Sequence, residues 1–94
     1  MSETVRCLRV TVQGKVQGVA FRWSTVRAAR GLKLTGWVRN NPDGSVSCLA
    51  EGAVASLNLL LRYLHHGPPL ARVDGIISDW SEATGMYHEF EVTH

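Results

Sequence analysis

A turn signal near the middle of the chain most constrains what this sequence can fold into. Residues 40–44 read Asn-Asn-Pro-Asp-Gly, and Asn, Pro, Asp and Gly each favour a turn for a separate physical reason. The flanking segments Leu34–Val38 and Val46–Glu51 have the residue pattern of strands, with Val46, Cys48 and Ala50 alternating with their neighbours in the second. A connection this short makes the two strands antiparallel neighbours. We therefore predict a β-hairpin at the centre of the fold.

A further strand and a helix are expected before the hairpin, and a helix after it. Alternating apolar residues predict a strand over Cys7–Val12, and the stretch from about Arg22 to Arg30 predicts a helix. Gly31 is expected at the C′ position that ends this helix. After the hairpin, a helix is expected from about Val54 to His65, with leucines at helical spacing on its core face. These leucines are Leu57, Leu60, Leu61 and Leu64.

The C-terminal third adds two extended segments. Gly67-Pro68-Pro69 ends the second helix, and strands are expected over Arg72–Asp79 and Tyr87–Thr93, with Ser81–Gly85 as the turn between them. The order βαββαβ, with an extra terminal strand, predicts an α+β ferredoxin-like sandwich. In it, an antiparallel sheet of four or five strands carries two helices on one face. At 94 residues we expect a single domain over residues 1–94, with a small core and a shallow active site.

This topology brings two distant loops to one edge of the sheet. The strands before and after the first helix run parallel, with the second hairpin strand between them and antiparallel to both. Their C-terminal ends therefore point the same way. The loop at residues 14–20 and the turn at residues 40–44 are expected at this shared edge, two strand spacings or roughly 10 Å apart.

The charge and hydropathy of the chain limit which kinds of partner it can have. The chain has 10 basic and 8 acidic residues, interspersed, for a net charge of +2, which is too weak a surplus to require nucleic acid. No apolar stretch approaches the ~18 residues of a membrane span, and the N-terminus lacks a secretion signal. We expect a cytoplasmic protein that acts without nucleic acid or membrane.

The residues that most often bind metals or form nucleophiles lack the spacing for either role. Cys7 and Cys48 belong to no CxxC motif and start no C-x5-R phosphate loop, so they are interpreted as reduced core or sheet residues. The four histidines show no ligand spacing, and we expect neither a metal nor a cofactor. They are His65, His66, His88 and His94. The three tryptophans are interpreted as packing residues.

A glycine-punctuated loop is the strongest functional signal. The stretch Gly14–Arg22 reads GKVQGVAFR and runs directly into the first predicted helix. Such a loop can aim backbone N–H groups and the positive end of a helix dipole at one oxyanion. Arg22, in the first helical turn, can approach the same anion through two hydrogen bonds. The residues indicate a phosphate or carboxylate site, the alternative being an ordinary loop beside a surface arginine.

Asn40 is the second candidate, at the opposite side of the same edge. Its amide can both donate and accept hydrogen bonds, which suits it to hold a water molecule. The alternative role is to form the turn that follows. Asp43 is the nearest acid to this position, and it too is either a turn residue or a direct participant.

These residues lie within two long motifs that resemble the signatures of the acylphosphatases. They are VQGKVQGVAFR at Val12–Arg22 and GWVRNNPDGSV at Gly36–Val46, and the similarity continues through Ala50–Gly52 to Phe90–Val92. The resemblance implies a small, cofactor-free enzyme on a ferredoxin-like fold. Such an enzyme hydrolyses the mixed anhydride of a carboxylic and a phosphoric acid. Inorganic phosphate is its product and, we expect, a competitive inhibitor.

The resemblance also implies roles for individual residues. Arg22 would bind the phosphoryl group and Asn40 would orient the attacking water. The loop amides that join Arg22 are those of Lys15, Val16, Gln17, Gly18, Val19 and Ala20. No general base is evident, so we expect a phosphate oxygen of the substrate to take the water's proton.

Two positions depart from the family pattern. Ala20 stands where a bulky aromatic or a glycine is usual, and Ser47 replaces an acidic or other polar residue. One alternative function is a non-catalytic anion- or peptide-binding module of the same fold. Another is the acylphosphatase-like domain of a larger carbamoyl-transfer maturation protein. The end of the chain at His94 favours a free-standing enzyme, expected to be a monomer.

Overall fold

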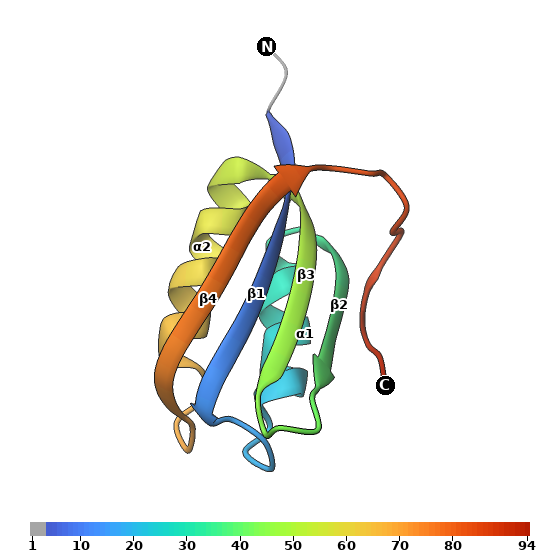
Figure 1. Ribbon diagram of the computed structural model, residues 1–94. Coiled ribbons are helices and arrows are strands. Elements are labelled where there is room, and N and C mark those ends of the chain that lie inside the picture. Colours follow the sequence, from blue (N-terminus) through green and yellow to red (C-terminus); the bar gives the residue numbers. More distant parts are fainter. Residues whose placement is uncertain (1–3) are drawn as a thin grey trace.

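The computed structural model describes residues 4–94, and five strands and two helices form in this part of the chain (Figure 1). In chain order they are β1 (Val5–Lys15), α1 (Phe21–Gly31), β2 (Thr35–Asn40), β3 (Val46–Ala53), α2 (Val54–His66), β4 (Arg72–Glu82) and β5 (Phe90–Val92). This order confirms the predicted βαββαβ arrangement with one additional terminal strand.

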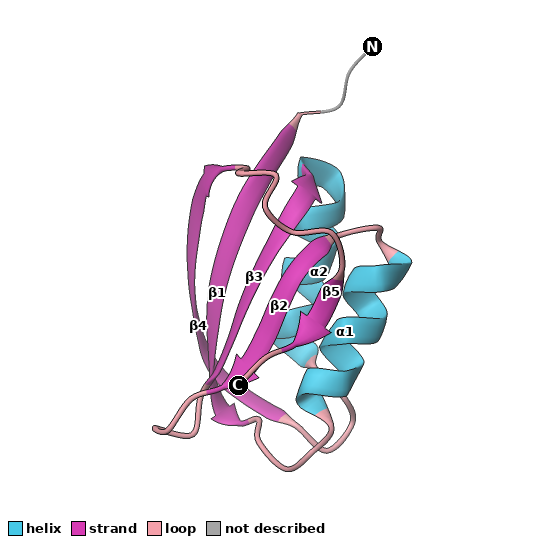
Figure 2. Cartoon of the chain, turned by 90° about the vertical axis from the view of Figure 1, so that its right-hand side faces the viewer, coloured by secondary structure: helices cyan, strands magenta, loops and turns pink. Residues whose placement is uncertain are grey.

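The strands form one sheet in the order β4-β1-β3-β2-β5 (Figure 2). β1 and β2 both pair antiparallel with β3, so they run parallel to each other with β3 between them, as predicted. The expectation of an antiparallel sheet throughout is wrong at one edge, where β5 pairs with β2 in parallel. After β4 the chain crosses the end of the sheet where β2 begins, so β5 enters in the same direction as β2 (Figure 1).

Both helices cover one face of the sheet, as expected (Figure 2). Alternate side chains of β1 point into the core between sheet and helices, because successive residues of a strand face opposite sides. Leu8, Val10 and Val12 are fully buried there. From α2 the core receives Leu57, Leu60 and Leu64, also fully buried, whereas Leu61 at the margin of the predicted stripe is half-buried.

The end of α1 differs from the prediction. Gly31 is the last helical residue, and Lys33, with φ of 60°, takes the left-handed conformation that was expected of Gly31. The N–H of Lys33 donates to the carbonyl of Arg30, and the N–H of Leu34 donates to that of Ala29. These two bonds satisfy the last helical carbonyls in the Schellman pattern. The helix therefore stops through a backbone motif that a lysine can adopt.

The C-terminal segment also differs in its boundaries. The predicted turn Ser81–Gly85 is wrong because β4 continues to Glu82, and residues 83–89 form a crossing loop. The predicted strand Tyr87–Thr93 shortens to β5. The Glu51 carboxylate, whose residue is 5% exposed, holds this loop through the N–H groups of Thr84 and Gly85, each at 3.0 Å. Burial alone would raise the pKa of Glu51, but these hydrogen bonds outweigh it and the pKa lies below its ordinary value.

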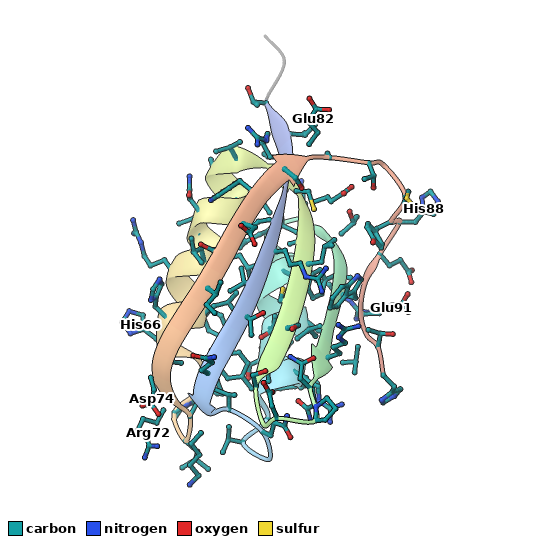
Figure 3. All side chains as sticks on the ribbon, viewed as in Figure 1. His66, Arg72, Asp74, Glu82, His88 and Glu91 are labelled. Carbon is teal, nitrogen blue, oxygen red and sulfur yellow. The ribbon has the colours of Figure 1, made fainter. Side chains whose placement is uncertain are left out.

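Charged side chains are distributed around the molecule. The acidic and basic side chains labelled in Figure 3 lie on β4 (Arg72, Asp74 and Glu82) and on β5 (Glu91). Among the described residues the ion pair is that of Arg72 and Asp74, with Nε and Oδ1 3.1 Å apart at the start of β4. Neither helix in residues 4–94 is long and apolar enough to cross a membrane.

Candidate active site

The loop between β1 and α1 turns on two residues in the left-handed backbone region. Gly18 has φ of 75° and Ala20 has φ of 63°. Glycine adopts this conformation at little cost, whereas an alanine there is strained. Val16 and Val19 anchor the loop, because both side chains are buried in the core. The loop backbone is thereby fixed in a tight bend at the edge of the sheet.

The loop leads into the N-terminus of α1 without a capping side chain. Ala20 is the N-cap residue, no side chain among residues 4–94 caps the helix, and the first turn of the helix contains no acidic residue. The first N–H groups of a helix have no partner within the helix and carry partial positive charge. This helix end can therefore receive an anion.

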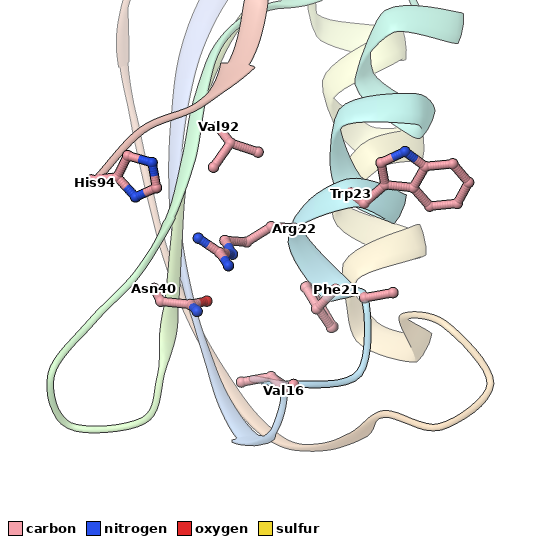
Figure 4. A pocket seen from close by; sticks show the side chains of 9 residues that line it. Val16, Phe21, Arg22, Trp23, Asn40, Val92 and His94 are labelled. Carbon is pink, nitrogen blue, oxygen red and sulfur yellow. The ribbon is translucent and has the colours of Figure 1, made fainter.

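Arg22 projects from the first turn of α1 toward β2 (Figure 4). It is half-buried, and in the described part of the chain it forms no ion pair. Its guanidinium therefore keeps its donors available for a ligand. A planar guanidinium can give two parallel hydrogen bonds to one phosphate.

Asn40 is the last residue of β2, and its side chain points toward Arg22 (Figure 4). Its Oδ1 is buried and has no hydrogen-bond partner among the described residues. Buried polar atoms are nearly always paired, so an exception requires an explanation. An amide oxygen directed at a pocket can accept a hydrogen bond from a ligand or a water molecule.

The turn following Asn40 is built by other residues. Asn41 donates its backbone N–H to the carbonyl of Ser45 at 2.8 Å, and its Nδ2 donates to the hydroxyls of Ser45 and Ser47. Asp43 Oδ1 accepts the Ser45 hydroxyl at 2.6 Å and the Ser45 N–H at 2.9 Å. These bonds lower the pKa of Asp43. Asp43 acts as a turn residue here, and Asn40 is left to face the pocket.

Arg22, Asn40 and the loop share one pocket of about 320 Å³. Its lining comprises Val16, Gly18, Ala20, Phe21, Arg22, Trp23, Asn40, Val92 and His94. The structure thus brings together both predicted side chains and three of the six predicted loop residues. Four lining residues were not predicted from the sequence. Phe21 and Trp23 flank Arg22, and Val92 and His94 reach the pocket from β5 and the segment beyond it.

The other three predicted loop residues lie differently. Lys15 ends β1 and pairs with Arg72 of β4. Val19 belongs to the hydrophobic core. The Gln17 side chain turns to the hairpin, where its Nε2 donates to the carbonyls of Asn41 and Ser45. None of the three lines the pocket, although each contributes backbone to the loop.

The described residues place neither a metal-binding group nor a thiol in the pocket. Within residues 4–94 no group of three His, Cys, Asp or Glu side chains could hold a metal ion. Cys7 and Cys48 are free thiols, both buried, and neither lines the pocket. Burial raises the pKa of Cys48 to about 12 and also raises that of Cys7. Both thiols are therefore protonated at neutral pH.

The fold and the pocket define a ferredoxin-like domain in which a helix N-terminus, one arginine and one asparagine face a common cavity. Comparison with known proteins specifies the class further. A family model described as Acylphosphatase matches residues 8–92. The acylphosphatase of Anaeromyxobacter dehalogenans is 47% identical over 92 residues, which cover 98% of each chain. That of Methylococcus capsulatus is 49% identical over 85 residues, covering 90% of this chain and 92% of the relative.

Solved structures agree with the sequence comparison. The crystal structure of acylphosphatase from Bacillus subtilis superposes with a TM-score of 0.92 at 35% identity, covering 95% of this chain and 99% of that one. Full-length HypF in its phosphate- and nucleotide-bound form matches all of this chain with 12% of its own length, at 25% identity and a TM-score of 0.90. The chain belongs to the acylphosphatase family.

Proposed function

We propose that this chain hydrolyses small acyl phosphates to a carboxylate and inorganic phosphate, in the pocket formed by Arg22, Asn40 and loop 15–20. The observation that carries the proposal is the meeting of Arg22 from α1 with Asn40 from β2 in one cavity beside an uncapped helix N-terminus. Family membership supports the reaction, because the relatives are acylphosphatases and cover nearly the whole chain.

Arg22 and the loop amides bind the phosphoryl group. The guanidinium has no competing ion pair among residues 4–94, and the first turn of α1 carries no acid that would repel an anion. As the bond to the leaving group lengthens, negative charge on the phosphoryl oxygens is held by donors that are already in place. Preorganised donors of this kind stabilise the transition state without the reorganisation that water requires.

Asn40 orients the water that attacks phosphorus. Its buried, unpaired Oδ1 can accept a hydrogen bond from that water. The water's oxygen forms a new bond to phosphorus as the bond from phosphorus to the carboxylate oxygen breaks. We infer that a phosphate oxygen of the substrate takes the proton without the help of a carboxylate, because the described residues of the pocket lining include no acid and Asp43 is engaged with Ser45.

The reaction requires little more from the protein. A carboxylate is a good leaving group that departs without being protonated, so positioning and charge stabilisation supply most of the acceleration. The thiols of Cys7 and Cys48 are buried away from the pocket, and the mechanism uses neither. We propose no cofactor, and inorganic phosphate as a competitive inhibitor that occupies the same donors.

We propose one domain over residues 1–94 that acts as a cytoplasmic monomer, without nucleic acid or membrane. Two free, buried thiols are consistent with a reducing compartment.

The test is phosphate release from an activated acyl phosphate, with a phosphate monoester as control. The wild-type chain is expected to hydrolyse the first and to leave the second nearly untouched, because an alkoxide is a far worse leaving group. Arg22→Ala should abolish turnover, whereas Arg62→Ala, an exposed arginine on α2, should leave it intact. Phosphate binding without any turnover would instead favour the non-catalytic anion-binding module.

A further inference from the structure

Gln17 lies in the middle of the loop, but its side chain points to the hairpin turn and does not line the pocket. Its Nε2 donates to the carbonyl oxygen of Asn41 at 2.7 Å and to that of Ser45 at 2.9 Å. Both distances are those of good N–H···O hydrogen bonds. The two carbonyls belong to the residues that open and close the hairpin turn, so one side-chain amide binds both ends of it.

These contacts join the two halves of the pocket. Asn41 follows Asn40 directly, and the Ser45 carbonyl also accepts the Asn41 N–H that closes the turn. In the region that the structure describes, no other hydrogen bond connects loop 16–20 with turn 41–45. The sheet sets the position of the Asn40 backbone through its pairing with Val46 of β3, and the Gln17 side chain is the direct hydrogen-bonded link between the loop and the turn that follows Asn40.

The chemistry of the contact selects glutamine. Both carbonyl oxygens lie within hydrogen-bond distance of Gln17 Nε2. A primary amide nitrogen carries two hydrogens, so it can donate one to each oxygen. Gln17 is half-buried, where hydrogen bonds are less weakened by competing water. A glutamate would present acceptors to acceptors, and a methionine of the same length would leave both carbonyls without this donor.

We propose that Gln17 is a positioning residue for hydrolysis, one that sets the distance between the phosphate-binding loop and Asn40. This inference rests on the proposed function of the pocket. Direct attack requires the water, the phosphorus and the leaving oxygen to be nearly in line, and a displacement of about 1 Å can cost on the order of 10²-fold in rate. Gln17 acts on the rate through Asn40 and does not touch the substrate.

The proposal predicts a specific kinetic pattern for Gln17→Met, which keeps the length of the side chain but removes both donors. Turnover should fall by about 10- to 100-fold, because the water is no longer held in line. The inhibition constant for inorganic phosphate should change by less than about threefold, since Arg22 and the loop amides remain. Gln17→Ala serves as a second variant, and Gln13→Ala as the control, because Gln13 is exposed on β1 and outside the pocket.

A double-mutant cycle with Asn40 separates positioning from a general loss of structure. In wild type, Asn40→Ala should lower turnover by about 10²-fold or more; the double mutant should be no more than about threefold slower than Asn40→Ala alone. If both side chains act on turnover through the same water, the second substitution lowers turnover little further once the first has been made. If they act independently, the two fold-losses in turnover multiply.

Two results would overturn the inference. One is a folded Gln17 variant that keeps more than half of wild-type turnover, and the other is a pair of losses that multiply fully in the double mutant. Wild-type activity is measured first, with circular dichroism on every variant. An inactive wild type would reject the proposed function itself, whereas an active wild type with unaffected Gln17 variants would reject only the role of Gln17.

Discussion

Asn40→Ala is expected to change activity and stability by very different amounts. The Asn40 side chain faces the pocket, and its buried Oδ1 has no hydrogen-bond partner within residues 4–94. A buried polar group left without a partner costs about 1–3 kcal/mol. The substitution removes that group, breaks no protein hydrogen bond of Oδ1, and enlarges a pocket without creating a closed cavity. We therefore expect the free energy of unfolding to stay unchanged or to rise by up to about 1 kcal/mol.

The effect on catalysis has the opposite direction. Loss of the group that orients the water should lower kcat by about 10²-fold or more, which corresponds to roughly 2.7 kcal/mol of transition-state stabilisation. Phosphate affinity should be nearly unchanged, because Arg22 and the loop provide the anion's donors. A functional residue that is neutral or costly for stability is a common consequence of building an active site.

The assay combines urea denaturation, kcat with an acyl phosphate, and the phosphate inhibition constant, all on one preparation. Asn58→Ala, the same chemical change at an exposed position of α2, is the control and should leave kcat unaltered. The reasoning is refuted if Asn40→Ala is folded and retains more than half of wild-type kcat. It is equally refuted if the variant loses more than about 1 kcal/mol of stability, since Asn40 would then be a structural residue.

Three further predictions concern stability, anion binding and the thiols. Glu51→Gln should lower the free energy of unfolding by about 2 kcal/mol, or roughly 8–16 °C in Tm, because the Glu51 carboxylate accepts three hydrogen bonds from loop 83–89; an unchanged melting curve would contradict this. Burial raises the pKa of Glu51 and the hydrogen bonds lower it more, so the net pKa is depressed. The stabilisation that Glu51 gives the fold is therefore present above the ordinary glutamate pKa of about 4.3 and is lost as the pH falls below that value. Calorimetry should find this pH dependence of stability weakened in Glu51→Gln. Inorganic phosphate at ten times its Kd should stabilise the wild type by about 1.4 kcal/mol, and Arg22→Ala should abolish the shift in Tm; a full shift in that variant would place the anion elsewhere. Iodoacetamide should leave activity intact, because Cys7 and Cys48 are buried with raised pKa values, and inactivation that phosphate prevents would show a thiol in the pocket.

The fold could be predicted where local chemistry determines it. The hairpin follows from turn residues at 40–44, and α2 follows from leucines at helical spacing, three of which are fully buried. The pairing of β5 with β2 could not be predicted in the same way. A strand of three residues is too short to show an alternating pattern of apolar residues, and its position beside β2 depends on the path of the crossing loop. The sequence predicts Gly31 at the C′ position of α1, whereas the structure has Lys33 there, because a sequence does not reveal when a lysine will take the left-handed conformation.

The candidate site shows the same division. Arg22 and Asn40 were placed near each other by strand order alone, since two parallel strands end at one edge of the sheet. The pocket residues Val92 and His94 depend on the unexpected pairing of β5. The contact of Gln17 with Asn41 joins residues 24 positions apart through a side chain, and no pattern in the sequence marks it.

The central claim is direct attack of water on phosphorus in the pocket of Arg22 and Asn40, and hydrolysis in ¹⁸O-labelled water tests it. We expect the wild type to place one labelled oxygen in the released phosphate and none in the carboxylate, because the bond between phosphorus and the bridging oxygen is the one that breaks. Arg22→Ala should release no phosphate above background under the same conditions. Label in the carboxylate would mean attack at the acyl carbon, and would contradict the assignment of the loop, Arg22 and Asn40 to the phosphoryl group.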